Sequence, residues 1–250
     1  CVFDGGQGGL ALHSFGDFLG LGEVVTHHWA LAVTGVAVIA VINAFNMLDG
    51  VDGLLGGYLV VVFSGFAWML YRHAAPPWML QCMVVMVLVL LAFLCCNASF
   101  KLSVFPRIFM GDAGSTMWGF VMAWWCIKLS QYPDQFLRPV ACLWFVALPL
   151  WDCARLMVVR LLKRRSMVKA DRSHVHHLLL ALGFSETKVC MVLWSFAALC
   201  VLFGFYVDMV QVKDVYVFSS FIISFICYCM VLVFLEFKVL GFNIREGNYE

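Results

Sequence analysis

The chain has 250 residues, of which 64% are hydrophobic and 12% charged, and its mean hydropathy is +0.94. Soluble domains carry about twice that share of charged residues, so the composition excludes an ordinary soluble domain and indicates a membrane protein. The formal net charge of +1 argues against a nucleic-acid partner. Most of the 11 cysteines lie inside apolar stretches and none forms a C-x-x-C pair, so we interpret them as small hydrophobic residues.

About seven apolar stretches follow one another along the chain, and most reach the roughly 20 residues that a helix needs to cross a bilayer. The predicted spans are Trp29–Met47, Leu54–Tyr71, Trp78–Phe100, Ala113–Ile127, Pro139–Trp151, Val189–Val207 and Val215–Leu235. We expect the fifth to continue to about Val159, and we interpret Asp152 and Arg155 within it as a structural ion pair. No internal repeat is present, so the sequence predicts an all-α fold, a transmembrane helix bundle forming one domain over residues 1–250.

The first residue is Cys1 rather than Met, and no signal peptide can be read at the start. We therefore expect the C-terminal part of a longer protein, in which residues 1–28 form the end of a preceding span and an external loop. Six Lys and Arg residues fall between Arg160 and Arg172, so the positive-inside rule places the basic, histidine-containing loop 159–188 in the cytoplasm. Counting spans from that loop places three polar clusters on the same face, whereas the external loops show no comparable cluster.

The first cluster is NAFNMLDGVDGLLGG, residues 43–57. Asn43, Asn46 and Asp49 are three residues apart and share one face of a helix. The glycines after Asp49 and Asp52 break that helix and allow a ligand to approach the backbone closely. The alternative is ordinary turn chemistry at the end of a span. The segment does not have the residue spacing that a calcium loop of the EF-hand type requires.

The second cluster is FPRIFMGDAGS, residues 105–115, together with Asn97 at the end of the third span. Asp112 stands between two glycines at the start of the fourth span. A carboxylate beside a helix N-terminus suits a magnesium–phosphate pair, with Arg107 facing the anion. The alternative is a plain capping aspartate.

The third cluster is DRSHVHHLLLALGFS, residues 171–185. The pattern predicts a short helix that ends at Gly183, with His174 and His177 on one face. No Cys or Glu is spaced to complete a zinc site with the histidines. Binding of a diphosphate by Arg172, His176 and the other two imidazoles is more economical, and the alternative is an interfacial basic loop.

Taken together, the motifs NAFNMLDGVDGLLGG, FMGDAGS and DRSHVHHL closely resemble those of the polyprenyl-phosphate N-acetylhexosamine-1-phosphate transferases, the membrane enzymes of glycosyltransferase family 4 that start bacterial surface glycans. The residues Asn-Met-Leu-Asp in the first motif and His-x-His-His in the third look more like the N-acetylglucosamine branch of the superfamily than the muramoyl-pentapeptide branch. The resemblance implies that undecaprenyl phosphate attacks a UDP-N-acetylhexosamine at the cytoplasmic face of the bacterial inner membrane and that UMP leaves. It also implies Mg²⁺, with Mn²⁺ as an alternative, and leaves a homodimer open.

The resemblance assigns the site residues in two groups. It makes Asp112 the magnesium ligand, and it makes Asp49, Asp52 and His174 the other catalytic residues. The remaining residues are assigned to substrate binding: Asn43, Asn46, Asn97, Arg107, Arg172, His176 and His177.

One departure from the family is the lack of an adjacent Asp-Asp pair, which family members carry on an earlier cytoplasmic loop. We expect that pair upstream of residue 1, with roughly four further spans, and we predict that these 250 residues are inactive alone. An inactive remnant or membrane scaffold is therefore the alternative function. A secondary transporter fits less well, because transporters place polar sites near the bilayer midplane in repeated halves.

Overall fold

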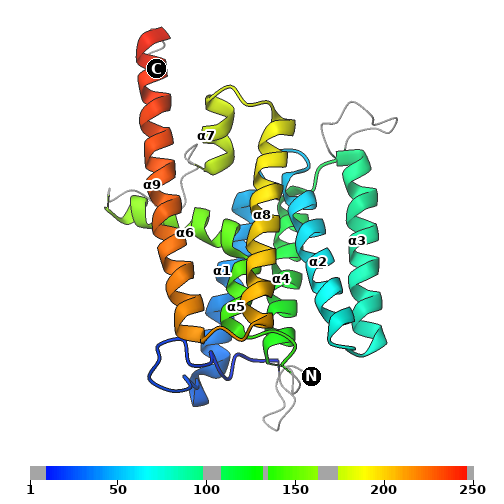
Figure 1. Cartoon of the computed structure of the whole chain (residues 1–250). Coiled ribbons are helices and arrows are strands. Elements are labelled where there is room, and N and C mark those ends of the chain that lie inside the picture. Colours follow the sequence, from blue (N-terminus) through cyan, green and yellow to red (C-terminus); the bar gives the residue numbers. More distant parts are fainter. Residues whose placement is uncertain (1–9, 98–107, 132–134, 163–173, 247–250) are drawn as a thin grey trace.

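The computed structural model describes residues 10–97, 108–131, 135–162 and 174–246, and in these ranges every extended regular element is a helix (Figure 1). The elements in chain order are η1 (His27–Trp29), α1 (Ala30–Leu48), α2 (Leu54–Arg72), α3 (Pro77–Asn97), α4 (Gly111–Ser130), α5 (Pro139–Phe145), α6 (Ala147–Leu162), α7 (Val175–Ala181), α8 (Glu186–Met209) and α9 (Asp214–Glu246). The predicted all-α bundle is confirmed.

Five helices are long and apolar enough to cross a membrane: α1 with η1, α2, α3, α8 and α9. The pair α5 and α6 makes a sixth candidate, and α4 runs beside α1 and α2 with 20 residues, a length that also suffices for a span (Figure 1). The prediction of about seven spans therefore agrees with the described part of the chain. The protein is a multi-pass membrane protein.

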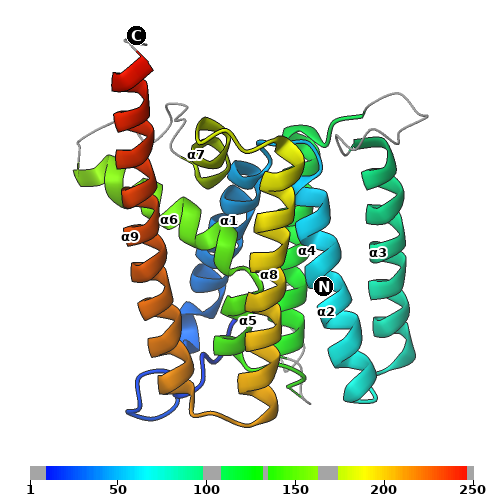
Figure 2. The ribbon, with the colours of Figure 1, turned by 45° about the horizontal axis from the view of Figure 1, so that its top comes forward.

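The fifth predicted span is wrong as a single straight helix, because α5 and α6 meet at an angle of 82°. Pro149 lies at the third position of α6 and has no N–H to give to the carbonyl of Phe145, so the helix breaks before it. The buried Tyr58 hydroxyl of α2 donates to that carbonyl instead, at 2.7 Å. As a result α6 lies across the other helices (Figure 2).

Close packing of the helices depends on small residues. A Cβ at Gly119 of α4 would lie 2.8 Å from the Cα of Ile42 in α1, so only glycine lets these two backbones approach so closely. Aromatic rings fill the centre of the bundle, where Phe66 of α2 stacks on Phe145 of α5 with ring centroids 4.7 Å apart. The rigid bundle fixes where each polar helix end lies.

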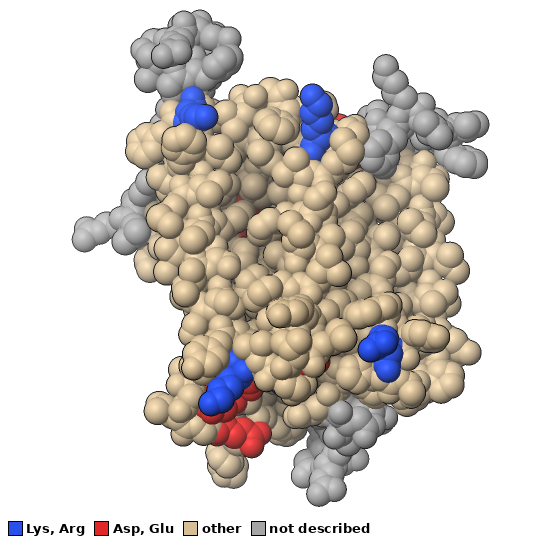
Figure 3. Space-filling view, viewed as in Figure 1, with Lys and Arg blue, Asp and Glu red and all other residues tan. Residues whose placement is uncertain are grey.

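The polar helix ends gather at one end of the molecule. The end of α1, the starts of α2, α4 and α8, and the short helix α7 all lie at the top of Figures 1 and 2. The loop 10–26, closed by a β-bridge between Ser14 and Val25, lies at the other end. On the face shown in Figure 3, the visible Lys and Arg side chains lie toward the two ends, and uncharged residues fill most of the middle.

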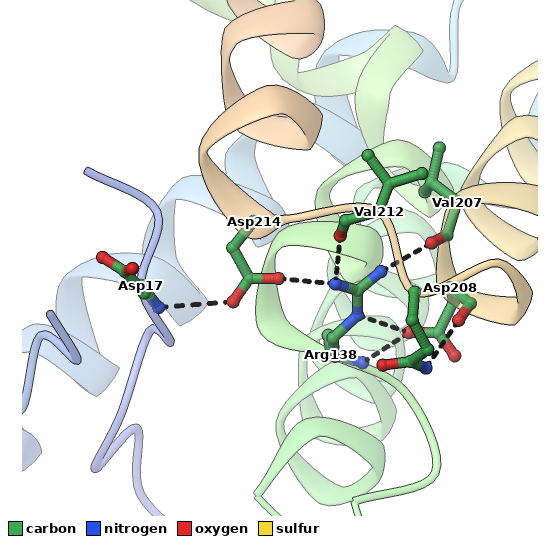
Figure 4. A network of polar contacts seen from close by, with 7 residues as sticks. Asp17, Arg138, Val207, Asp208, Val212 and Asp214 are labelled. Atoms are coloured by element: carbon green, nitrogen blue, oxygen red, sulfur yellow. Dashed lines mark hydrogen bonds and ion pairs between the residues drawn. The ribbon is translucent and has the colours of Figure 1, made fainter. Parts of the chain in front are cut away.

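The end opposite the motifs holds a polar network that the sequence analysis did not expect (Figure 4). Arg138, which precedes α5, donates to Asp208 of α8 at 3.0 Å and to Asp214 of α9 at 2.7 Å. Its Nη1 and Nη2 atoms also donate to the backbone carbonyls of Val212 and Val207. The network joins the ends of three helices, so the prediction that this side of the bundle carries no comparable cluster is wrong.

Candidate active site

The first two motifs meet through Asn46. Its side-chain nitrogen, near the end of α1, donates to Asp112 Oδ1 at 3.3 Å and to Ser115 Oγ at 2.9 Å, both in the first turns of α4. The Ser115 hydroxyl donates back to the carbonyl of Gly111. Asp112 is exposed and is held by a neutral donor, which leaves its carboxylate available to a ligand.

Asp49 is the residue at the C-terminal end of α1, and it lies near two other carboxylates, Asp52 and Asp112. Burial, and then the negative charges of Asp52 and Asp112, raise the pKa of Asp49 from 3.8 to about 6. Asp52 and Asp112, from two different motifs, are thus both close enough to Asp49 for their charges to act on it. A cation at this position would relieve the repulsion.

Asn97 holds the turn between α1 and α2 in place. Its Oδ1 accepts from the backbone N–H of Gly53 at 2.7 Å, and its Nδ2 donates to the carbonyl of Ile108 at 2.8 Å. The side chain is buried and uses both ends of its amide. Asn97 therefore connects the aspartate-bearing turn to the segment that leads into α4, and substrate contact by Asn97 stays a prediction.

The third motif packs against the first at Gly50. A Cβ on Gly50 would lie 2.1 Å from Nε2 of His176, so the imidazole occupies the space that any other side chain would fill. His176 is 1% exposed, and its Nδ1 is buried with no hydrogen-bond partner among the described residues. Burial, with smaller contributions from His177 and His174, lowers the pKa of His176 to about 3, so its ring is neutral.

The short helix α7 brings the three histidine rings together. The ring centroids of His176 and His177 are 4.3 Å apart, and those of His174 and His176 are 5.5 Å apart and stacked. Gly183 ends the helix in a left-handed conformation, with the N–H groups of Gly183 and Phe184 bonded to the carbonyls of Leu180 and Leu179. The predicted helix end at Gly183 is confirmed.

Asp152 belongs to this site, although the sequence analysis paired it with Arg155. Its Oδ2 lies 2.7 Å from Nδ1 of His174, while Arg155 forms an ion pair at 2.7 Å with Glu236 of α9. Asp152 was missed because the bend before α6, which turns it toward α7, was not predicted. The available signal was a carboxylate in the middle of an apolar segment, which usually has a functional partner.

Three predicted substrate-binding residues remain without a described contact to the site. Asn43 is exposed on α1, one turn before Asn46. Arg107 and Arg172 lie outside the described residues, as do residues 163–173 of the basic loop. Their assigned roles stay predictions.

The chemistry of the site fits magnesium better than a metal held entirely by protein. Among the described ranges, no group of three or more His, Cys, Asp or Glu side chains is placed to hold a metal ion. Magnesium needs no such group, because it keeps several waters and takes one or two carboxylates together with phosphate oxygens. Asp112, with the repelling charges of Asp49 and Asp52 beside it, supplies this kind of oxygen donor set.

Comparison with known proteins agrees with the motifs. Residues 2–130 match the sequence model of glycosyl transferase family 4. The chain is 34% identical over 221 residues to the undecaprenyl-phosphate alpha-N-acetylglucosaminyl 1-phosphate transferase of Yersinia pestis, covering 88% of this chain and 60% of that protein. It is 33% identical over 240 residues to the protein of the same name from Escherichia coli O157:H7, covering 96% and 62%.

The protein of that name from Haemophilus influenzae gives 33% identity over 221 residues, with 88% of this chain and 62% of the relative covered. The chain thus spans 60–62% of the length of these three relatives. The family match covers more than half of the chain, and within it Asn46 of the first motif bonds to Asp112 of the second. The chain belongs to glycosyl transferase family 4.

Proposed function

We propose a transferase function for the protein that contains this chain. It transfers N-acetylglucosamine 1-phosphate from UDP-N-acetylglucosamine to undecaprenyl phosphate. The observation that carries this proposal is the bond from Asn46 to Asp112, which joins two distant motifs, while Gly50 of the first motif packs against His176 of the third. The names of the relatives give the acceptor lipid and the sugar phosphate. The UDP donor follows from the resemblance of the motifs.

The reaction exchanges one pyrophosphate bond for another. An oxygen of the lipid phosphate forms a bond to the β-phosphorus of the UDP-sugar, the bond from that phosphorus to the bridging oxygen breaks, and UMP leaves with the electron pair. Because both reactants are anions, catalysis rests on positioning and on neutralising charge. Magnesium, when bound, supplies that neutralisation.

The residues of the chain have separate tasks in this reaction. Asp112 would hold the magnesium ion, and Asn46 orients its carboxylate by donating to Oδ1. Asp49 and Asp52 add negative charge that favours the cation. His176 is neutral and buried against Gly50, so it holds the turn that bears Asp49, and its assignment to the sugar nucleotide rests on the resemblance of the motifs.

We also propose that the protein lies in the bacterial inner membrane with the site facing the cytoplasm. The basic residues from Arg160 in the last turn of α6 to Arg172 precede α7, which lies at the end of the bundle where the motifs meet. That face is where a soluble nucleotide sugar and a lipid phosphate can meet.

The test uses membranes that contain the longest open reading frame including this chain, supplied with undecaprenyl phosphate, magnesium and radiolabelled UDP-N-acetylglucosamine. We expect label in the lipid fraction, and we expect Asp112→Asn to reduce it by at least about a hundredfold, as loss of a charge-stabilising group does elsewhere. Asp17→Asn makes the same change in an exposed residue at the other end of the molecule and should keep full activity. Unchanged transfer in Asp112→Asn, or no transfer in the wild type, would contradict the proposal.

A further inference from the structure

Asp152 is a buried carboxylate surrounded by hydrogen-bond donors. It is 2% exposed in α6. Its Oδ2 lies 2.7 Å from His174 Nδ1, and its Oδ1 accepts from the N–H of Val175 at 3.2 Å and from the Tyr228 hydroxyl at 3.0 Å. Three segments, α7 with the residue before it, α6 and α9, therefore meet at one carboxyl group.

The contact of Asp152 with His174 fixes the protonation state of one ring nitrogen. A carboxylate only accepts hydrogen bonds, so Nδ1 of His174 carries a proton and donates it to Oδ2 of Asp152. A bond from Nδ1–H to a carboxylate is also the usual way in which proteins fix the orientation of a functional histidine.

Asp152 also fixes where α7 begins. His174 is the residue before the first turn of this helix, and its own side chain makes no capping bond to the helix. Asp152 supplies the acceptor for the first helical N–H, that of Val175. Because α7 carries His176 and His177 and directly follows His174, its start sets their distance from Gly50 and from the aspartates.

We propose that Asp152 is a positioning residue of the transferase site, which holds His174 in the Nδ1-protonated form and keeps the histidine helix α7 against the turn that bears Asp49. Tyr228 holds the carboxylate from the other side, so α9 also supports the site. This inference rests on the proposed function for its effect on catalysis. The hydrogen-bond geometry itself is independent of that function.

The first experiment compares Asp152→Asn with Asp208→Asn. The second variant makes the same change at another buried, ion-paired aspartate, at the opposite end of the bundle. We expect Asp152→Asn to lower kcat by about tenfold to a hundredfold, the usual range for loss of such a supporting carboxylate, while KM for the sugar nucleotide changes less than threefold. Asp208→Asn should keep kcat per folded molecule.

The second experiment reads the tautomer of His174 directly, by ¹⁵N NMR of histidine-labelled protein in lipid, with His174→Gln to assign the signal. In Asp152→Asn the amide NH₂ can donate to Nδ1, so the proton of His174 should move to Nε2. Tyr228→Phe keeps the carboxylate and should keep the Nδ1-protonated form.

The outcomes separate this inference from the proposed function. Equal kcat in wild type and Asp152→Asn, or equal losses in Asp152→Asn and Asp208→Asn, would overturn the positioning role. If His174 kept its proton on Nδ1 in Asp152→Asn, the claim that Asp152 determines which nitrogen of His174 is protonated would be overturned. If the wild type showed the Nδ1-protonated His174 but transferred no sugar phosphate, the proposed function would be overturned, and the control of His174 by Asp152 would stand.

Discussion

At the scale of single residues, Gly50 has no room for a side chain. We predict that Gly50→Ala displaces the His176 ring, since the added Cβ would lie 2.1 Å from Nε2, and lowers transferase activity by at least tenfold (~1.4 kcal/mol). Gly35→Ala is the matched control, because a Cβ there meets no atom within 4 Å. Initial rates and thermal melting of both variants check the prediction. Equal activity of the two variants would mean that the position of His176 does not matter.

Asp49 gives a prediction about pH. Its pKa in the folded chain, about 6, lies above the ordinary 3.8, so the charged carboxylate destabilises the fold above pH 6. This penalty fades as the pH falls through 6 toward 3.8. Asp49→Asn removes the charge, so in magnesium-free buffer the variant should melt at a higher temperature than wild type at pH 7.5.

The difference in melting temperature should shrink as the pH is lowered to 4.5. Thermal melting in detergent at several pH values measures it. Asp17→Asn, which changes an exposed aspartate at the other end of the molecule, serves as the control. A constant difference between Asp49→Asn and wild type at all pH values would contradict the raised pKa.

Single residues show how far sequence reasoning reaches in this site. Asn46, Asp49 and Asp112 were found from spacing, because residues three apart on a helix end and a carboxylate in a glycine-rich helix start have local signatures. Asp152 was not assigned to the site, because its partner His174 is 22 residues away and only tertiary structure brings them together. Local patterns find the groups that face the ligand, and the groups that hold them come from elsewhere in the fold.

At the scale of helices, the length and apolar character of most spans were predicted correctly, but the break between α5 and α6 was not. The signal was Pro149, which removes one backbone donor in the middle of an apolar stretch. What the sequence could not show is the replacement donor, the hydroxyl of Tyr58. Pairing a lost donor with a distant hydroxyl requires the packed bundle.

The break yields a prediction for stability. Tyr58→Phe keeps the ring but leaves the buried carbonyl of Phe145 without its donor, which should cost about 1 to 2 kcal/mol of unfolding free energy. Tyr216→Phe makes the same change on an exposed ring and should cost nothing measurable. Unfolding of both variants in mixed detergent micelles compares them. Equal stability would mean that the break needs no hydroxyl.

At the scale of the whole molecule, one end carries the proposed chemistry and the other end carries the Arg138 network. The network joins the start of α5, the end of α8 and the start of α9. We therefore expect it to determine stability rather than turnover.

Arg138→Gln should lower the unfolding free energy by about 3 kcal/mol, because it leaves two mostly buried carboxylates without their cation. Arg72→Gln, an exposed change at the same end of the molecule, should be nearly neutral. Denaturation in mixed micelles measures both variants. If folded Arg138→Gln showed a lower kcat or a higher KM without losing stability, this division of roles would be contradicted.

The contacts between α6 and α9 also set an order of events during synthesis. Asp152 and Arg155 enter the membrane with α6, but their partners Tyr228 and Glu236 follow 76 and 81 residues later in the chain. At about 5 to 20 residues per second, the ribosome needs several seconds to reach them. During that interval the newly inserted α6 holds a carboxylate and a guanidinium without these partners. The buried carboxylate and guanidinium of α6 thus reach their α9 partners only after two further helices, α7 and α8, have been made.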